Sequence, residues 1–178
     1  MAVRAILLAG GLGTRLHPLT VELPKPMVPV LGKPWLSRLI DQLAAFGVTD
    51  ITLSLRHGGQ VVTDYFRESP PGVRLRFAVE PQPLGTGGAI RFAAGPDPTD
   101  TLLILNADIV QTFDLNALLE FHRQHRAQVT IGLVEVADPS AYGAVELDKN
   151  SRVTRFVEKP RPGETDSRMV NAGVYVFD

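Results

Sequence analysis

The fold is decided by an apolar run that ends in glycines, Val3-Arg4-Ala5-Ile6-Leu7-Leu8-Ala9-Gly10-Gly11-Leu12-Gly13-Thr14-Arg15. Its apolar half is typical of a parallel β-strand that is buried on both faces, so we expect residues 3–9 to form the central strand of an α/β sheet. The glycines that follow allow backbone N–H groups to surround phosphate oxygens, because no Cβ atom stands in the way. Arg15 adds a permanently charged guanidinium that can donate two parallel hydrogen bonds. The stretch therefore predicts a phosphate-binding loop after the first strand.

Two widespread phosphate-binding motifs do not match this loop. The dinucleotide-binding fingerprint requires a third glycine three residues after Gly13, where Leu16 stands. The P-loop requires Ser or Thr after Gly32-Lys33, where Pro34 stands. The remaining alternative is a tight turn that binds nothing, and the guanidinium of Arg15 directly behind the glycines favours a binding loop over such a turn.

The segment after the loop is stiffened by five prolines, at positions 18, 24, 26, 29 and 34. Prolines at this density forbid a long helix and predict an extended, shaped loop. Lys25 stands between two of them, so its backbone is fixed and its ammonium group is restricted in direction. On this motif alone, a binding site and an ordinary loop are equal alternatives.

The composition excludes several classes of function. With 44% hydrophobic residues, the chain is typical of a soluble globular domain, and its apolar run at residues 5–9 is too short for a membrane span or a signal peptide. The absence of cysteine excludes disulfides, a thiolate nucleophile and a sulfur-bound zinc site. A formal net charge of −1 argues against nucleic acid as a partner, whereas an excess of basic residues within positions 1–35 suits a small polyanion. We therefore expect a cytoplasmic protein with no membrane partner.

Helical and strand patterns alternate over the rest of the chain. Helices are predicted at residues 34–47, 59–66, 86–94 and 114–125, with Asp114 as the N-cap of the last. Strands are predicted at residues 50–55, 75–79, 102–105, 129–134, 144–147, 153–157 and 174–178, of which 144–147 and 153–157 form a hairpin. This order predicts one α/β domain over residues 1–178, with a mixed, mainly parallel central sheet and a substrate-facing hairpin flap. Because no helix follows the last strand, we expect the domain to be C-terminally incomplete.

Four basic or ionisable residues gather near the end of the predicted helix 114–125. The cluster His122, Arg123, His125 and Arg126 has a composition found in metal and nucleic-acid sites. This spacing on a helix is more often a solvated face, however, and we expect the solvated face here.

Six motifs follow one another along the chain. They are residues 8–34, Pro83-Leu84-Gly85-Thr86-Gly87-Gly88-Ala89, Leu105-Asn106-Ala107-Asp108, Tyr142-Gly143, Phe156-Val157-Glu158-Lys159-Pro160 and Asn171-Ala172-Gly173. In this order and spacing they resemble the sugar-1-phosphate nucleotidyltransferase family, and within it the mannose-1-phosphate guanylyltransferase branch and the related heptose-1-phosphate enzymes. The resemblance implies a Rossmann-like three-layer fold with the hairpin flap over the sugar site. Ala107 departs from the glycine that usually precedes the aspartate in this family.

The resemblance also implies roles for individual residues. Arg15, Lys25 and Asp108 are the implied catalytic residues, and Asp108 is the implied ligand of a Mg²⁺ cofactor between the nucleotide and sugar phosphates. The implied nucleotide-binding residues are Leu8, Gly10, Gly11, Gly13, Thr14, Glu80, Gly85 and Thr86. The implied sugar-phosphate-binding residues are Asn106, Gly143, Glu158, Lys159 and Asn171. The family's second metal-binding aspartate falls beyond Asp178, so no residue of this sequence is assigned to it.

The implied reaction transfers a nucleoside monophosphate from a nucleoside triphosphate to a sugar 1-phosphate and releases pyrophosphate. By the resemblance we expect mannose 1-phosphate as the sugar, and Glu80 favours GTP because a carboxylate can accept both N1–H and the amine of guanine. An ion pair with an arginine at the pocket rim is the alternative role of Glu80. The alternative functions are a non-catalytic module that binds nucleotide and sugar phosphate, and an enzyme that joins UTP or dTTP to glucose 1-phosphate. The sequence does not indicate the oligomeric state, and a homo-oligomer is one of the alternatives.

Overall fold

The computed structural model describes residues 3–11, 13–96, 100–110, 112 and 114–178, with the backbone but not the side chain of Arg15. Its helices are η1 (Thr14–Leu16), η2 (Lys25–Met27), α1 (Trp35–Ala45), α2 (Gly59–Tyr65), α3 (Gly85–Ala94) and α4 (Leu115–His125), of which η1 and η2 are single 3-10 turns. Its strands are β1 (Val3–Leu8), β2 (Pro29–Val30), β3 (Lys33–Pro34), β4 (Asp50–Leu55), β5 (Arg74–Val79), β6 (Thr101–Asn106), β7 (Val129–Glu135), β8 (Gly143–Leu147), β9 (Val153–Glu158) and β10 (Met169–Phe177). All helices and strands that the sequence predicts are present, and β10 is clearly longer than expected.

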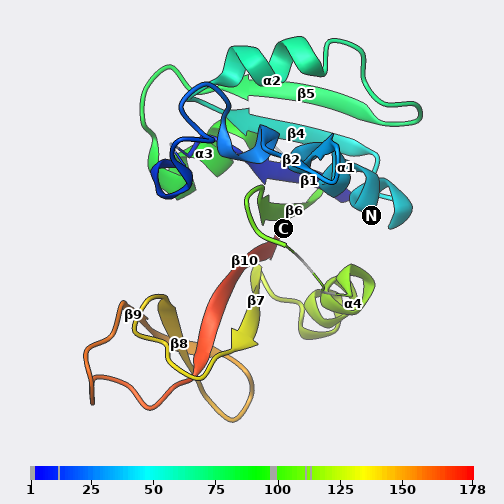
Figure 1. The fold of residues 1–178 in the computed structure, drawn as a ribbon. Coiled ribbons are helices and arrows are strands. Elements are labelled where there is room, and N and C mark those ends of the chain that lie inside the picture. The colour runs from blue at the N-terminus through cyan, green and yellow to red at the C-terminus, as the bar shows by residue number, and fades with distance from the viewer. Residues whose placement is uncertain (1–2, 12, 97–99, 111, 113) are drawn as a thin grey trace.

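The strands form one eight-stranded sheet and a separate pair made of β2 and β3 (Figure 1). The order in the large sheet is β5-β4-β1-β6-β10-β8-β9, and β7 pairs with β10. β1 lies between β4 and β6 with parallel pairing on both sides, which confirms it as the centre of the parallel part. This part comprises four of the eight strands, so the sheet is mixed but less parallel than the sequence indicated. The difference arises because β7 to β10 pair as antiparallel neighbours without helical crossovers.

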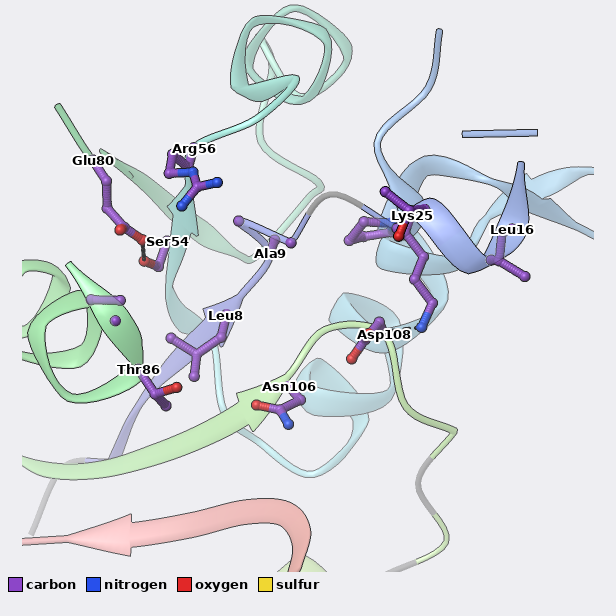
Figure 2. Close-up of a pocket in the computed structure, with 17 residues that line it drawn as sticks. Leu8, Ala9, Leu16, Lys25, Ser54, Arg56, Glu80, Thr86, Asn106 and Asp108 are labelled. Atoms are coloured by element: carbon purple, nitrogen blue, oxygen red, sulfur yellow. Dashed lines mark hydrogen bonds and ion pairs between the residues drawn. The ribbon is translucent and has the colours of Figure 1, made fainter. Parts of the chain in front are cut away.

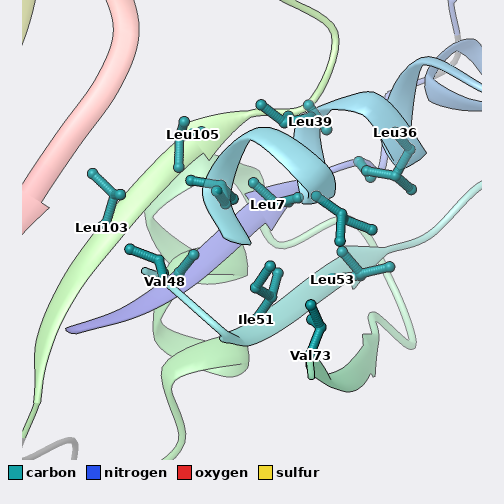
Figure 3. Close-up of a cluster of buried hydrophobic side chains, with 14 of the residues drawn as sticks. Leu7, Leu36, Leu39, Val48, Ile51, Leu53, Val73, Leu103 and Leu105 are labelled. Atoms are coloured by element: carbon teal, nitrogen blue, oxygen red, sulfur yellow. The ribbon is translucent and has the colours of Figure 1, made fainter. Parts of the chain in front are cut away.

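Helices cover both faces of the parallel part, which gives the expected three layers. Successive residues of a strand point to opposite faces, and the two faces meet different helices. Leu7 and Leu105 face the larger core cluster, which contains residues of α1, α2 and α4 (Figure 3). Ile6 and Ile104 face the smaller cluster, which contains Ile90 of α3. Among the described residues, no helix is long and apolar enough to cross a membrane.

The N-terminus of α4 is capped as the sequence predicts. Asp114 Oδ1 accepts hydrogen bonds from the backbone N–H groups of Asn116 (3.0 Å) and Ala117 (3.1 Å). Asp114→Ala is expected to lower the free energy of unfolding by about 1 kcal/mol, because both N–H groups lose their acceptor. Asp114→Asn keeps an acceptor oxygen and should be nearly neutral, and urea unfolding measures both variants. An alanine variant as stable as the wild type would contradict the capping role.

The solvated face predicted for the end of α4 is wrong for one residue. His122 is only 1% exposed, with Nδ1 2.8 Å from Thr130 Oγ1 and Nε2 3.3 Å from Asp178 Oδ1. It continues the buried stripe of Leu115 and Leu119, since residues three and four apart share one face of a helix. His125 does lie at the surface, where its ring stacks on Phe121 at 4.0 Å.

β10 joins the parallel part of the sheet to the β8–β9 hairpin. Its residues 174–177 pair with β6, its Val170 pairs with Ala144 of β8, and β7 runs along its other side. The register shifts between Asn171 and Tyr175, where Gly173 has a φ of 68°. In Figure 1 the hairpin lies at the end of β10 remote from β6. The predicted hairpin is therefore present, and its position over a sugar site stays a prediction.

Candidate active site

A cavity of about 670 Å³ lies where the four parallel strands end. Leu8 and Asn106 close β1 and β6, while Arg56 and Glu80 directly follow β4 and β5 (Figure 2). The chain passes from β1 to β4 and β5 on one side and then returns to β6 on the other side of β1. The carboxyl edge of a sheet at such a reversal is where ligands bind in open α/β proteins. The described residues that line the cavity are Leu8, Ala9, Gly10, Gly11, Gly13, Thr14, Leu16, Lys25, Pro26, Ser54, Arg56, Glu80, Gly85, Thr86, Ala89, Asn106 and Asp108.

The glycine-rich loop forms one wall of this cavity. Gly13 has a φ of 64°, and a Cβ atom on it would lie 2.9 Å from Lys25 Cβ, so glycine is required both for the backbone conformation and for the approach of Lys25. Thr20 Oγ1 donates a hydrogen bond to the carbonyl of Gly13 (2.8 Å), which ties the loop to the proline-rich segment. Among the described residues, no hydrogen bond uses the backbone N–H groups of Gly10, Gly11 or Gly13. These donors can therefore receive an anion.

Lys25 and Asp108 meet at one end of the cavity. Lys25 Nζ lies 2.8 Å from Asp108 Oδ2, and the two side chains are 28% and 39% exposed. The stiff backbone of Lys25 and the end of β6 bring together residues that are 83 positions apart in the chain. A partly exposed ion pair contributes only about 0–1 kcal/mol, so a phosphate or a cation can separate the two side chains at low cost.

A second carboxylate lies at the other end of the cavity, as Figure 2 shows. Glu80 Oε1 accepts a hydrogen bond from Ser54 Oγ (3.3 Å), and Oε2 accepts one from the backbone N–H of Leu84 (3.3 Å). Both contacts are long, so the carboxylate keeps most of its capacity as an acceptor. Glu80 makes no ion pair with the arginines whose side chains are described, which disfavours the alternative role of a rim ion pair.

Two polar residues of the cavity were missed by the sequence analysis. Ser54 and Arg56 stand at the carboxyl end of β4, next to the end of β1. The strand prediction for residues 50–55 contained the signal, because all parallel strands end at the same edge of a sheet. Arg15 lies in η1, at the same loop, and its side chain is outside the described part of the structure.

The residues predicted to bind the sugar phosphate are divided between two places. Asn106 lines the cavity, whereas Gly143, Glu158 and Lys159 meet in the hairpin. A Cβ atom on Gly143 would lie 3.1 Å from Glu158 Oε2, and the backbone N–H of Lys159 donates to the carbonyl of Tyr142 (2.8 Å). Lys159 has a φ of 47°, which is uncommon for a lysine. Glu158 and Lys159 line a separate hollow outside the cavity.

Asn171 connects these two places through the bulge in β10. Its Oδ1 accepts a hydrogen bond from the backbone N–H of Gly173 (2.9 Å), and its Nδ2 donates to the hydroxyl of Tyr175 (2.8 Å). A Cβ atom on Gly173 would lie 2.5 Å from Asn106 Nδ2, so only glycine lets the bulge approach the cavity wall this closely. Asn171 thus holds the backbone that packs against Asn106.

The end of the cavity beside Lys25 offers a metal ion one carboxylate, that of Asp108. Among the described residues, no group of three or more His, Cys, Asp or Glu side chains is arranged to hold a metal ion. Asp108 is partly exposed in the cavity, beside the loop that can receive an anion. This donor set fits Mg²⁺, which keeps several waters and binds one or two carboxylates together with substrate phosphates.

An open α/β sheet with a glycine-rich loop and charged side chains at its reversal point is the architecture of ligand-binding α/β proteins. The chain belongs to the nucleotidyl transferase family, whose model matches residues 4–178. It is 43% identical over 177 residues to the mannose-1-phosphate guanylyltransferase of Mycobacterium tuberculosis, covering 99% of this chain and 49% of that protein. It is 39% identical to the mannose-1-phosphate guanyltransferase of Aspergillus fumigatus, covering 99% of this chain and 50% of that protein. The chain thus spans about half the length of the curated relatives it matches.

Solved structures agree with this assignment. The crystal structure of HddC from Yersinia pseudotuberculosis complexed with GMP-PN superposes with a TM-score of 0.81 at 34% identity, covering 98% of this chain and 76% of that one. A UDP-glucose pyrophosphorylase complexed with UDP-glucose has a TM-score of 0.83 at 20% identity, covering 99% of this chain and 76% of that one. At that identity the second match shows the shared fold alone.

Proposed function

We propose that this chain forms the catalytic domain of a sugar-1-phosphate nucleotidyltransferase that transfers GMP from GTP to mannose 1-phosphate and releases pyrophosphate. The observation that carries the proposal is a single cavity with Glu80 at one end and the Lys25–Asp108 pair at the other. The glycine-rich loop lies along its wall. This arrangement suits a molecule with a base at one end and a triphosphate at the other. The similarity to two mannose-1-phosphate guanylyltransferases supports the choice of GTP and mannose 1-phosphate.

The proposed reaction depends on positioning and charge neutralisation. A phosphate oxygen of the sugar 1-phosphate, which is already ionised, attacks the α-phosphorus of GTP. A new P–O bond forms, the bond from the α-phosphorus to the bridging oxygen of the β-phosphate breaks, and pyrophosphate leaves with the electron pair. The loop N–H groups, Arg15 and Lys25 bind the negative charge of the phosphates during this step. Asp108 would hold Mg²⁺, which would supply further positive charge to the phosphates.

The sugar phosphate is proposed to bind between the cavity and the β8–β9 hairpin. The close packing of Gly173 on Asn106 supports this, because it places one end of the Asn171 bulge at the cavity wall. Glu158 and Lys159 then supply an acceptor for sugar hydroxyls and a cation for the phosphate. The hairpin would close over the sugar as a flap.

A pyrophosphate-release assay tests the proposal. The chain is assayed in Mg²⁺ with GTP, ATP, UTP and dTTP, each combined with mannose 1-phosphate or glucose 1-phosphate. Pyrophosphate release that is fastest with GTP and mannose 1-phosphate is the expected result. Release with UTP or dTTP and glucose 1-phosphate would contradict the proposed substrates. Tight binding of GTP without release would favour the non-catalytic module.

The preference for guanine is expected to depend on Glu80. Uracil would turn a carbonyl oxygen towards the carboxylate, and facing acceptors cost about 1–3 kcal/mol, so GTP should bind roughly 5- to 150-fold more tightly than UTP. The glutamine introduced by Glu80→Gln can donate as well as accept hydrogen bonds. The variant should therefore bring the dissociation constants of GTP and UTP closer together. Equilibrium titration with each triphosphate in Mg²⁺ measures this ratio.

The control for this prediction is Glu68→Gln. Glu68 is exposed and lies outside the cavity, so its replacement removes the same charge without touching the site. It should leave the GTP-to-UTP ratio unchanged. If UTP binds the wild type as tightly as GTP does, the guanine assignment is wrong, while the nucleotidyltransferase reaction with another base stands.

A further inference from the structure

Arg56 is a cation of the cavity to which the proposed reaction gives no role. It is the first residue after β4 and is partly buried, and it lines the cavity at the same end as Glu80 (Figure 2). A Cβ atom on Gly10 would lie 3.3 Å from Arg56 Cβ and 3.5 Å from Glu80 Oε1. The absence of a side chain on Gly10 therefore eases the close approach of Arg56 to the loop, at a point that also lies beside Glu80.

Arg56 and Glu80 carry opposite charges at the same end of the cavity, yet they do not form an ion pair within 4.0 Å. The Glu80 carboxylate is held by Ser54 and Leu84. The Arg56 guanidinium makes no hydrogen bond with any described residue, so its donors remain unused. In Figure 2 it is directed towards the space beside Leu8 and Ala9. Guanidinium donors that no described residue uses, beside a carboxylate without an ion pair, suit a ligand that presents acceptors to one and donors to the other.

We propose that Arg56 recognises the second edge of guanine, by donating hydrogen bonds to O6 and N7 while Glu80 accepts those of N1–H and the exocyclic amine. The proposal rests on the proposed function, because it deepens the choice of GTP. Guanine carries O6 and N7 side by side, and the planar fork of an arginine matches them in a bidentate pair. The two residues then bind adjacent edges of one ring from the ends of adjacent strands, β4 and β5.

The same pair of residues rejects the other bases for different reasons. Adenine has an amine in place of O6, so a donor would face the donors of Arg56. It also lacks the N1–H that Glu80 requires. Uracil and thymine have no imidazole ring, and therefore no N7 for the guanidinium. Arg56 and Glu80 therefore both discriminate against adenine, each at a different edge of the base.

A phosphate is the competing ligand for the Arg56 guanidinium. Among the proposed phosphate-binding groups, Gly10 lies beside Arg56, whereas Lys25 lies towards the opposite end of the cavity from Glu80 (Figure 2). A phosphate contact would strengthen the binding of all triphosphates alike, because they share that part. A base contact would strengthen binding only where O6 and N7 are present.

The experiment compares dissociation constants of GTP, 7-deaza-GTP and ITP in Mg²⁺ by calorimetric titration. 7-deaza-GTP lacks only the N7 acceptor, and ITP lacks only the exocyclic amine. A hydrogen bond to a charged group corresponds to roughly a ten- to hundredfold difference in affinity, so the wild type should bind each analogue that much more weakly than GTP. In Arg56→Met the difference between GTP and 7-deaza-GTP should disappear, while the difference between GTP and ITP remains.

Three further variants make the result specific. Glu80→Gln should give the reverse pattern, with the ITP difference reduced and the 7-deaza-GTP difference retained. Arg67→Met removes the same charge from a side chain that is 80% exposed and outside the cavity, and it should match the wild type with all three ligands. Circular dichroism melts establish that each variant is folded, and Arg56→Lys provides a milder change that keeps the charge but loses the fork.

The outcomes separate this inference from the proposed function. Equal weakening of GTP, 7-deaza-GTP and UTP in Arg56→Met would overturn the inference in favour of a phosphate contact. A wild type that binds 7-deaza-GTP as tightly as GTP, but still prefers GTP to UTP, would overturn it while leaving the GTP assignment intact. A wild type that binds UTP as tightly as GTP would overturn both.

Discussion

Arg15→Ala is expected to lower turnover by about 100-fold or more, because it removes a preorganised cation from the phosphates on which charge builds in the transition state. Arg15 follows the glycine-rich loop and lies in η1, between the loop and the proline-rich segment that carries Lys25. Steady-state pyrophosphate release with saturating GTP and mannose 1-phosphate measures the effect. The melting temperature should change little, since the backbone of the residue belongs to a single 3-10 turn outside the sheet.

The control for Arg15→Ala is Lys33→Ala. Lys33 belongs to the same basic segment, but it pairs with Asp41 and does not line the cavity. If the loss of turnover came from net charge alone, the two variants would behave alike. An Arg15→Ala protein that turns over like the wild type would show that Arg15 is not a catalytic residue.

Asp108→Asn is expected to lower turnover on the order of 100-fold and to raise the Mg²⁺ concentration needed for half-maximal rate, because an amide is a much weaker ligand than a carboxylate. The ion pair with Lys25 provides a second readout. Without Asp108, Lys25 is no longer neutralised, so GTP should bind the variant in the absence of Mg²⁺ at least as tightly as it binds the wild type. Mg²⁺ titrations of the rate and metal-free GTP titrations measure the two effects.

Asp41→Asn serves as the control for Asp108→Asn. Asp41 is an exposed partner of Lys33 outside the cavity, so its loss should change neither titration. A Mg²⁺ titration of Asp108→Asn that coincides with that of the wild type would place the metal elsewhere. Weaker metal-free binding of GTP in the same variant would contradict the idea that Asp108 competes with the triphosphate for Lys25.

The sequence predicted the parallel half of the fold well, because its signals are local. The apolar run that became β1 and the helical spacing of Leu36, Leu39 and Leu43 in α1 both reflect burial, which depends on which face of an element is covered. β10 was predicted too short, since Asn171 and Gly173 interrupt its apolar pattern and resemble a turn. The pairing partners of β10 lie far away in the chain and leave no local pattern.

The candidate site was predictable where chemistry is concentrated in one motif. The glycines predicted the phosphate-binding loop, and the flanking prolines drew attention to Lys25. Both the loop and Lys25 line the cavity. The contact between Lys25 and Asp108 was not predictable from either residue, because it depends on how a loop and a distant strand end meet. Arg56 belongs to no motif, and its place in the cavity depends on the pairing of β4 with β1. The roles of these residues in binding and catalysis stay predictions.

The position of β10 also determines how the sheet can assemble. β10 is the last of the described strands, yet it is the partner of β6, β7 and β8. The four parallel strands and α1 to α3 lie within residues 3–106, so this part of the sheet can form without β10, although β1 and β6 pair residues 98 positions apart. Until residues 169–177 dock, one edge of β6 and the whole of β7 lack a partner. Until β10 docks, these unpaired edges are the places where another chain could add.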